Sequence, residues 1–284
     1  MVEEKTEKHE HGVHESSEEK TITLKKSTLW AAGAFVLLVL LVISVFTGGF
    51  GITGKAGANT NTGDNANTEA QTGSEIAIDF SKLIPSDAIS FGSKDAPITV
   101  VEFTDFSCPY CAIASGDSSS LVTYAKKNFG SSWEPIVSNL IKDYVNTDKV
   151  RLVTMYMIGH SGGHPAQIVA WCLNDQNPKL TEKFYSQAFA TAGMDSAGQY
   201  VTDVENQTKM ENIAKNLGAD MNKLQACINS NKFASRFDSE QNAGSKLGIQ
   251  GTPSFLIGKT EGNTAVYISG AVPYSTFKQA LSAA

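Results

Sequence analysis

The sequence predicts an α/β domain preceded by a single transmembrane helix. Three observations predict it: an uncharged apolar stretch near the N-terminus, strand-like and helix-like segments along the rest of the chain, and two cysteines two residues apart where a strand passes into a helix. The 284 residues include 23 basic and 29 acidic side chains, giving a formal net charge of −6. A nucleic-acid-binding protein would normally present a basic face, so this class is not expected.

The apolar stretch near the N-terminus has the length of a membrane span. No charged residue occurs in residues 27–54, and the apolar centre runs from Leu29 to Phe46. About 20 helical residues span about 30 Å, the thickness of the hydrocarbon core of a bilayer. We therefore expect a transmembrane helix over residues 27–47. A cleaved signal peptide is the alternative, but a long polar segment precedes the block and no clear small-residue cleavage site follows it.

The lysines at the ends of this stretch predict its orientation. Lys25 and Lys26 adjoin its N-terminal end, and Lys55 is the only basic residue close behind it. The positive-inside rule places residues 1–26 in the cytoplasm, as a disordered tail, and the large domain outside. Residues 48–75 are rich in Gly, Asn, Thr and Ala and are expected to form a flexible linker.

The histidines do not predict a metal site. His9, His11 and His14 lie among glutamates and lysines, where imidazoles and carboxylates are possible ligands. We favour a solvated tail that binds metal only adventitiously. His160 and His164 flank a Gly-Gly turn, and we interpret them as surface loop residues rather than as ligands or catalytic groups.

The order of elements in the C-terminal portion is strand, helix, strand, a helical block, then strand, strand and helix. The first strand, residues 98–106, is rich in β-branched and aromatic side chains, which is typical of a buried strand. A helical stretch follows the cysteine pair. Apolar spacing and turn residues predict the remaining elements: helix 133–144, strand 150–157, helices 166–173, 180–190, 207–217, 221–228 and 233–247, strands 253–257 and 265–269, and a helix from 274 to the end.

The sequence Cys108-Pro-Tyr-Cys111 has the spacing of a redox-active pair. At the start of a helix, unpaired N–H groups and the positive end of the dipole stabilise a thiolate on Cys108. Pro109 suits the first turn because it has no N–H group to leave unpaired. Cys111, one turn further, is expected to be the more buried, resolving thiol. One alternative is half of a zinc site, but the sequence contains no second cysteine pair with this spacing. The other alternative is a purely structural disulfide.

Two segments resemble the DsbA-like thiol–disulfide oxidoreductases. Glu102-Phe-Thr-Asp-Phe-Ser-Cys-Pro-Tyr-Cys111, which includes Tyr110 between the cysteines, is similar to the active-site stretch of that family. Gly251-Thr-Pro-Ser-Phe-Leu-Ile-Gly258 resembles its cis-proline loop. The resemblance covers about residues 90–283. It implies that Pro253 is cis and lies against Cys108, and that the backbone of Thr252 pairs with an extended substrate chain.

The resemblance also implies the fold and a buried acid. The expected architecture is a thioredoxin-like domain over residues 76–284, with a helical subdomain inserted at about 160–247. Glu102 occupies the position of the buried acid of the family, where a carboxylate exchanges the proton that Cys111 must lose. A solvent-facing strand glutamate is the alternative. Asp105 lies on the opposite face of the strand and is expected to be a turn or helix-start residue.

Two further features of the C-terminal portion carry predictions. Residues 116–133 make the chain about 15–20 residues longer here than the family pattern, as an extra helix or a loop over the active site. With Cys108 and Cys111 assigned to each other, Cys172 and Cys227 remain as a structural disulfide. It would close a loop of about 56 residues and contribute about 4 kcal/mol in the chain-entropy model. Buried free thiols are the alternative.

We expect a dithiol oxidase that introduces disulfides into exported, thiol-containing proteins. The resemblance implies that a membrane-embedded, quinone-linked partner reoxidises it, and we predict no cofactor or metal of its own. A disulfide reductase or isomerase is one alternative, although isomerases of this kind usually carry a separate dimerisation domain, which the sequence before residue 90 does not suggest. A tethered chaperone or binding module without redox turnover is another. The intact Cys-Pro-Tyr-Cys sequence argues against it.

Overall fold

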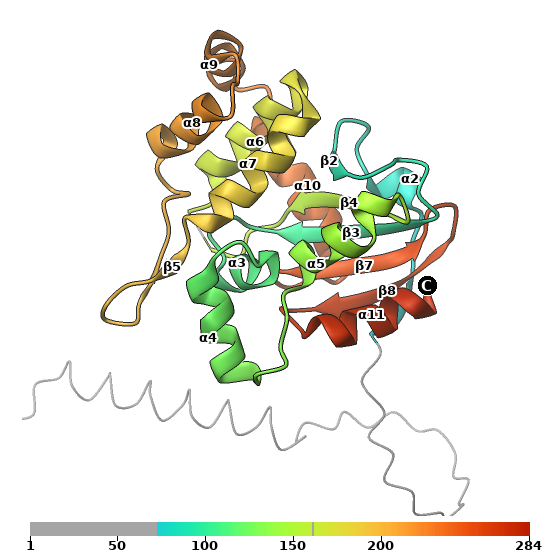
Figure 1. Ribbon diagram of the computed structural model, residues 1–284. Helices are drawn as coiled ribbons and strands as arrows, with labels where there is room; N and C mark the ends of the chain where they lie inside the picture. Colours follow the sequence, from blue (N-terminus) through green and yellow to red (C-terminus); the bar gives the residue numbers. More distant parts are fainter. Residues whose placement is uncertain (1–72, 161) are drawn as a thin grey trace, which may run out of the picture. The chain divides into compact units, whose positions relative to one another are not determined.

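The centre of the fold is a six-stranded mixed sheet (Figure 1). The structure is a computed structural model, and it describes residues 73–160 and 162–284. The strand order is β1-β8-β7-β3-β4-β2; β3 and β4 run parallel, and the other neighbouring strands run antiparallel. The strands are β1 (Ser74–Ala77), β2 (Ile89–Phe91), β3 (Ile98–Thr104), β4 (Val150–Tyr156), β7 (Ser254–Lys259) and β8 (Thr264–Ser269).

The helices lie between these strands and after the last of them. They are α2 (Phe80–Leu83), α3 (Pro109–Ser115), α4 (Ser119–Phe129), α5 (Ile136–Asp143), α6 (His164–Gln176), α7 (Pro178–Ala190), α8 (Gln207–Asn216), α9 (Met221–Asn229), α10 (Ala234–Lys246) and α11 (Tyr274–Ala283), with a 3-10 turn η1 (Val145–Thr147). Across residues 73–160 and 162–284, none of the helices combines the length and apolar character needed to cross a membrane. The predicted membrane helix at 27–47 lies outside the described residues.

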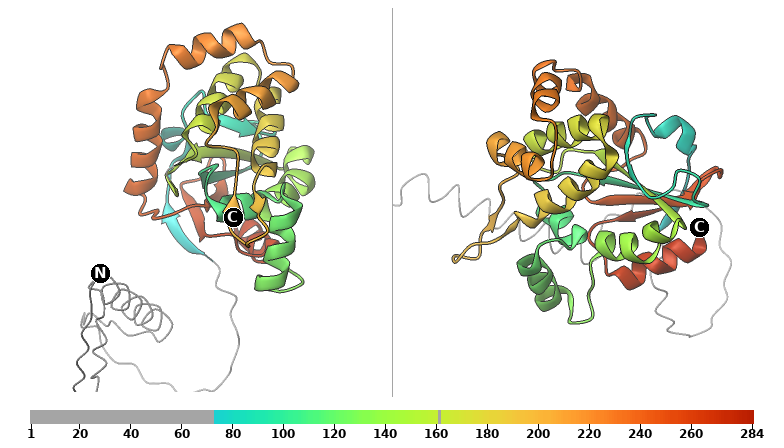
Figure 2. Two further views of the ribbon diagram at one scale, coloured as in Figure 1. Left: turned by 90° about the vertical axis from the view of Figure 1, so that its left-hand side faces the viewer. Right: turned by 45° about the horizontal axis from the view of Figure 1, so that its top comes forward.

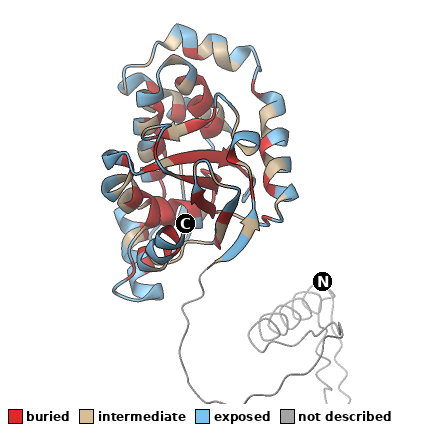
Figure 3. Ribbon diagram, turned by 90° about the vertical axis from the view of Figure 1, so that its right-hand side faces the viewer, coloured by how far each residue is buried: buried red, intermediate tan, exposed pale blue. Residues whose placement is uncertain are grey.

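Helices cover both faces of the sheet because successive strand residues point to opposite sides. On one face, Val100 and Leu152 pack with the inward sides of α3, α5, α6, α7 and α11. On the other face, Val101 and Val153 pack with α10 and with Phe80 of α2. The left view of Figure 2 shows the sheet between α10 and the group formed by α3, α4 and α5. All but one residue of β3 and all but one residue of β4 are buried (Figure 3). The buried C-terminal end of β3 therefore leads directly into α3.

The segment between β4 and β7 is the inserted subdomain. It contains α6 to α10, as expected for a helical insertion, and in addition a short hairpin, β5 (Gly193–Met194) with β6 (Tyr200–Val201), which the sequence did not predict. Cys172 of α6 and Cys227 of α9 form a disulfide, with 5.8 Å between their Cα atoms. Because their positions in the sequence differ by 55, the bridge contributes about 4 kcal/mol in the chain-entropy model.

Two strands differ from the sequence expectations, and one helix is the first of the two forms expected for its segment. Strand β1 begins at Ser74, two residues before the expected domain boundary at 76, and pairs with the distant strand β8. Strand β2 has three residues, too few to show a periodic pattern. The extra segment at 116–133 contains a helix, α4, whose first turn is capped by Ser118, with the N–H of Leu121 donating to its Oγ at 3.4 Å.

Candidate active site

Cys108 occupies the N-cap of α3, and a short turn joins it to the central strand β3. Its N–H donates to the carbonyl of Asp105 at 3.0 Å, and its own carbonyl accepts the N–H of Ala112 at 3.0 Å. Pro109 is the first helical residue, where its missing N–H leaves no intrahelical bond unmade. The helix therefore presents its free N–H groups around the sulfur of Cys108.

The two thiols have opposite electrostatic environments. A hydrogen bond from Cys111, together with the Thr252 hydroxyl and the backbone N–H groups of Cys111 and Tyr110, lowers the pKa of Cys108 to about 6 against the opposing effect of burial. Burial, and then the proximity of Cys108 and Glu102, raise the pKa of Cys111 well above the ordinary thiol value. Both side chains are buried, at 1% and 0% exposure, whereas Tyr110 between them is 52% exposed. Charge stabilisation, rather than exposure, distinguishes the two sulfurs.

The loop before β7 lies against Cys108. Antiparallel pairing of β7 with β3 places Ser254 opposite Phe103, so the two residues that precede β7 lie at the end of β3. The Thr252–Pro253 peptide bond is cis. The Thr252 carbonyl oxygen lies 3.4 Å from Sγ of Cys108, within the range for a bond donated by the thiol. The contact brings together two segments that lie 144 residues apart in sequence.

Glu102 lies in the core beneath the cysteines. Its side chain is 0% exposed, and Oε2 accepts a hydrogen bond from the hydroxyl of Tyr185 at 2.7 Å. Oε1 is buried and has no hydrogen-bond partner within residues 73–160 and 162–284. Burial raises the pKa of this carboxyl to about 7, opposed by the bond from Tyr185. A carboxyl group with this pKa is present in both protonation states at neutral pH, as a proton carrier requires.

A second carboxyl group acts on Glu102. Asp117, in the turn between α3 and α4, is half-buried and accepts a hydrogen bond from the hydroxyl of Ser186. Burial raises its pKa, and its charge adds to the raised pKa of Glu102. Glu102 therefore experiences the negative charges of Asp117 and of the Cys108 thiolate.

Asp105 differs from the expectation of an ordinary turn residue. It does start the turn before Cys108, but its carboxylate is fully buried and accepts four hydrogen bonds. His160 and His164 are both exposed, as expected, but only His160 lies in a loop; His164 is the first residue of α6, and its ring packs against Phe237 with 4.2 Å between centroids. No group of three or more potential metal ligands occurs in the part of the chain that the structure describes.

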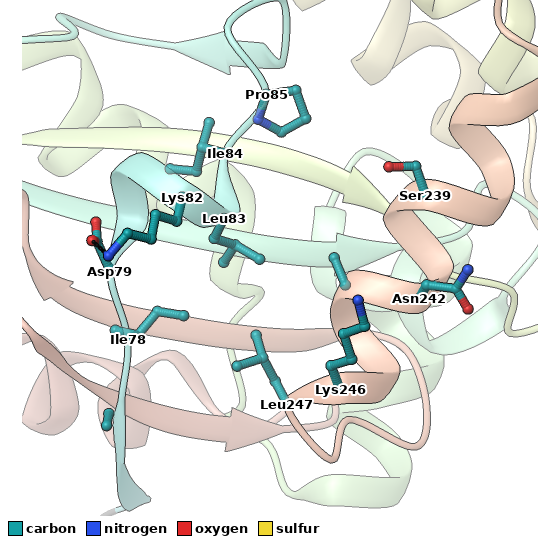
Figure 4. A pocket seen from close by; sticks show the side chains of 12 residues that line it. Ile78, Asp79, Lys82, Leu83, Ile84, Pro85, Ser239, Asn242, Lys246 and Leu247 are labelled. Carbon is teal, nitrogen blue, oxygen red and sulfur yellow. Dashed lines mark ion pairs between the residues drawn. The ribbon is translucent and has the colours of Figure 1, made fainter.

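The cavities of the described domain include one well apart from the cysteines. It has a volume of about 660 Å³ and lies between the β1–α2 connection and α10, as Figure 4 shows. Its lining includes Leu83, Lys246 and Leu247, and none of the site residues predicted from the sequence. Redox chemistry is therefore assigned to the surroundings of Cys108 and not to this cavity.

Sequence reasoning did not identify Tyr185, Asp117 or Asp105 as part of the site. Tyr185 comes from the inserted subdomain, 83 residues from Glu102, and a helical pattern does not reveal which distant group a buried tyrosine contacts. Asp105 carried a local signal, because an aspartate two residues before a serine commonly bonds the N–H group of that serine.

Known proteins share this architecture. A protein-family model described as thioredoxin matches residues 86–127 and 131–281, more than half of the chain. The curated protein "Disulfide bond formation protein D" of Bacillus subtilis (strain 168) is 24% identical over 178 residues, and the match covers 58% of this chain and 65% of that protein. The chain thus matches less than two thirds of the length of this relative.

Several solved structures have the same fold. BdbD from Bacillus subtilis has a TM-score of 0.53 at 19% identity, covering 75% of this chain and 97% of that one. A thioredoxin-like oxidoreductase from Silicibacter pomeroyi DSS-3 has a TM-score of 0.52 at 24% identity, with coverages of 73% and 97%. α-DsbA1 from Wolbachia pipientis has a TM-score of 0.52 at 17% identity, with coverages of 72% and 94%. The matching family model covers most of the described domain, and the chain therefore belongs to the thioredoxin family.

Proposed function

We propose that this protein is an extracytoplasmic dithiol oxidase that transfers the Cys108–Cys111 disulfide to cysteine-containing proteins. The observation that carries the proposal is the opposite stabilisation of two adjacent thiols: the pKa of Cys108 is lowered to about 6 and that of Cys111 is raised. A low-pKa thiol is a good leaving group and favours the reduced form of the pair, so the disulfide is readily donated.

The reaction proceeds through a mixed disulfide. A substrate thiolate attacks Sγ of Cys108, a substrate–Cys108 bond forms, and the Cys108–Cys111 bond breaks with Cys111 leaving. A second substrate thiolate then attacks the substrate sulfur of the mixed disulfide, and Cys108 leaves as a thiolate. The substrate loses two electrons and the protein gains them. The cis Thr252–Pro253 loop beside Cys108 supports pairing of the substrate backbone at Thr252.

Glu102 serves as the proton carrier for the buried thiol. Cys111 leaves inside the core, where a charged sulfur is disfavoured, so it needs a proton at that moment. Glu102 donates this proton, and it accepts the proton again when the pair is reoxidised. The hydroxyl of Tyr185, bonded to Oε2 at 2.7 Å, holds the carboxyl in place and limits the rise of its pKa.

The energetic consequence at neutral pH follows from the pKa of Cys108. At pH 7, a thiol with a pKa of about 6 is mostly thiolate, whereas an ordinary thiol with a pKa of 9.0 is almost entirely protonated. The excess ionisation stabilises the reduced protein by about 1.4 kcal/mol, which shifts a two-electron couple by about 30 mV towards the oxidising side.

The location and the partners belong to the same proposal. Residues 27–47 cross the membrane, residues 1–26 remain in the cytoplasm and residues 48–73 tether the domain outside, as the apolar stretch and the flanking lysines indicate. The substrates are exported proteins with free thiols, and a membrane-embedded, quinone-linked partner reoxidises Cys108 and Cys111. The resemblance to the DsbA-like family and the similarity to "Disulfide bond formation protein D" support this assignment.

Mixed disulfides trapped in cells test the function and the location together. The Cys111→Ser variant lacks the resolving thiol, so conjugates through Cys108 should accumulate, and they should contain exported cysteine-bearing proteins. Protease added outside intact cells should digest these conjugates, whereas the double variant that also carries Cys108→Ser should form none. Conjugates with cytoplasmic proteins, protected from external protease, would refute the proposed location and substrates.

A further inference from the structure

The carboxylate of Asp105 joins two loops at the active site. Oδ1 accepts the N–H of Ser107 at 2.9 Å and its hydroxyl at 2.8 Å, directly before Cys108 in the chain. Oδ2 accepts the N–H groups of Gly159 and His160, each at 2.8 Å, from the segment after β4. The hydroxyl of Ser107 also lies 3.2 Å from the carbonyl of His160. A single buried side chain therefore fixes the distance between these loops.

Side chains, rather than strand pairing, hold the segment after β4. Pairing of β4 with β3 continues to Met157, whose N–H donates to the carbonyl of Thr104 at 3.0 Å. The N–H of Ile158 then donates to the side-chain carbonyl of Gln241 at 2.8 Å. The next two N–H groups bind Asp105. Because three consecutive amides have side-chain acceptors, the position of residues 158–160 depends on those acceptors.

This segment packs against Cys108 through its backbone. A Cβ atom built on Gly159 would lie 2.2 Å from Oγ1 of Thr252 and 3.3 Å from Cβ of Cys108. A Cβ atom on Gly163 would lie 2.0 Å from Oδ1 of Asp105. The absence of side chains at both glycines permits this close approach. Cys108 is 1% exposed, and the segment contributes to covering this residue, which must meet the substrate.

We propose that Asp105 is a positioning residue that holds residues 158–160 against Cys108 and thereby limits which partners reach its sulfur. While residues 158–160 lie against Cys108, an extended chain lying along Thr252 reaches the sulfur and a bulky group does not. Loss of the hydrogen bonds to Asp105 lets residues 158–160 move away from Cys108, and bulky groups then also reach its sulfur. The inference rests on the proposed function only for its consequence, the selection of extended polypeptide substrates.

The test compares the rates at which a small and a bulky reagent alkylate Cys108. The full chain carries Cys111→Ser, so that Cys108 is the reacting thiol, and iodoacetamide is compared with a maleimide bearing a large fluorophore. The ratio of the two rates at one pH cancels any change in the thiolate fraction. Asp105→Asn should raise the bulky-to-small ratio about tenfold, as expected when a charged hydrogen bond that opposes local opening is lost. Ser107→Ala, which keeps the carboxylate, should raise it less.

Asp220→Asn is the matched control. Asp220 also accepts two backbone N–H groups, at 3.0 and 3.1 Å, but at the start of α9. Asparagine also caps a helix start, so this variant should keep a thermal stability close to that of the parent and should not change the ratio. An unchanged ratio in Asp105→Asn would overturn the inference, whatever the loss of stability; if that variant does not fold, an unchanged ratio in Ser107→Ala would do so. Alkylation of Cys108 requires no redox turnover, so the ratio of the two rates can be interpreted even if the protein is not a dithiol oxidase.

Discussion

Replacing Cys108 with serine should reduce the oxidation of a reduced, unfolded protein to the uncatalysed level. The serine hydroxyl neither forms a disulfide nor accepts attack by a thiolate, and Cys111 does not substitute for it. Cys111 is fully buried, and its raised pKa leaves it protonated at neutral pH. The measurement is the loss of free thiols in a reduced protein mixed with stoichiometric amounts of the pre-oxidised chain, with the unaltered chain as the positive control.

The Cys111→Ser variant should behave differently in the same assay. It should also lose turnover, because it has no internal disulfide to donate, yet Cys108 should still form mixed disulfides with substrate thiols in the presence of glutathione disulfide. Mixed disulfides found on Cys111 in the Cys108→Ser variant, at a yield similar to those on Cys108, would reverse the roles assigned to the two cysteines.

Replacing Glu102 with glutamine should stabilise the protein at alkaline pH and slow its redox cycle. Folding raises the pKa of Glu102 from 4.5 to about 7, so the native state binds more protons than the unfolded state between these values. Stability therefore falls as the pH rises through this window, by roughly 3 kcal/mol in total. Glutamine keeps an acceptor for the Tyr185 hydroxyl but does not titrate. The difference in unfolding free energy between variant and parent should grow from near zero at pH 4 to roughly 3 kcal/mol at pH 8.

The same variant should slow the steps that move a proton to or from Cys111. Stopped-flow measurement of resolution of a Cys108–glutathione mixed disulfide should show an inflection near pH 7 in the parent and none in Glu102→Gln. Glu261→Gln, which changes an exposed carboxylate in the turn between β7 and β8, serves as the control and should retain both pH profiles. Parallel stability curves for Glu102→Gln and its parent would contradict the role of Glu102.

The sequence was most informative where long periodic segments and a local motif coincide. Strands β3 and β4 and helices α6 to α10 follow the expected order because each contains enough apolar residues to show its period. Strands β1 and β2 and the β5–β6 hairpin have two to four residues each, and β1 depends on pairing with the distant β8. Short strands stabilised by distant partners leave no periodic pattern in the sequence.

The site residues show the same difference between local motifs and contacts with distant parts of the chain. The cysteine spacing and the resemblance pointed to Cys108, Cys111, Glu102 and the Thr252–Pro253 loop, and the structure places these around one sulfur. Tyr185 was not predicted, because its contact with Glu102 depends on how the inserted subdomain packs on the sheet. The burial of Asp105 was missed because strand alternation predicts the face on which a residue lies, but not whether a later loop covers that face.

The reduction potential of the Cys108–Cys111 pair as a function of pH tests the central claim most directly. With the pKa of Cys108 at about 6 and that of Cys111 raised, reduction takes up two protons below pH 6 and one above it. Equilibration with glutathione should therefore give a slope of about 59 mV per pH unit below the break and about 30 mV above it. At pH 7 the potential should be clearly more oxidising than the value of about −270 mV for thioredoxin. A potential as reducing as that of thioredoxin, with no break near pH 6, would contradict the assignment of this protein as a dithiol oxidase.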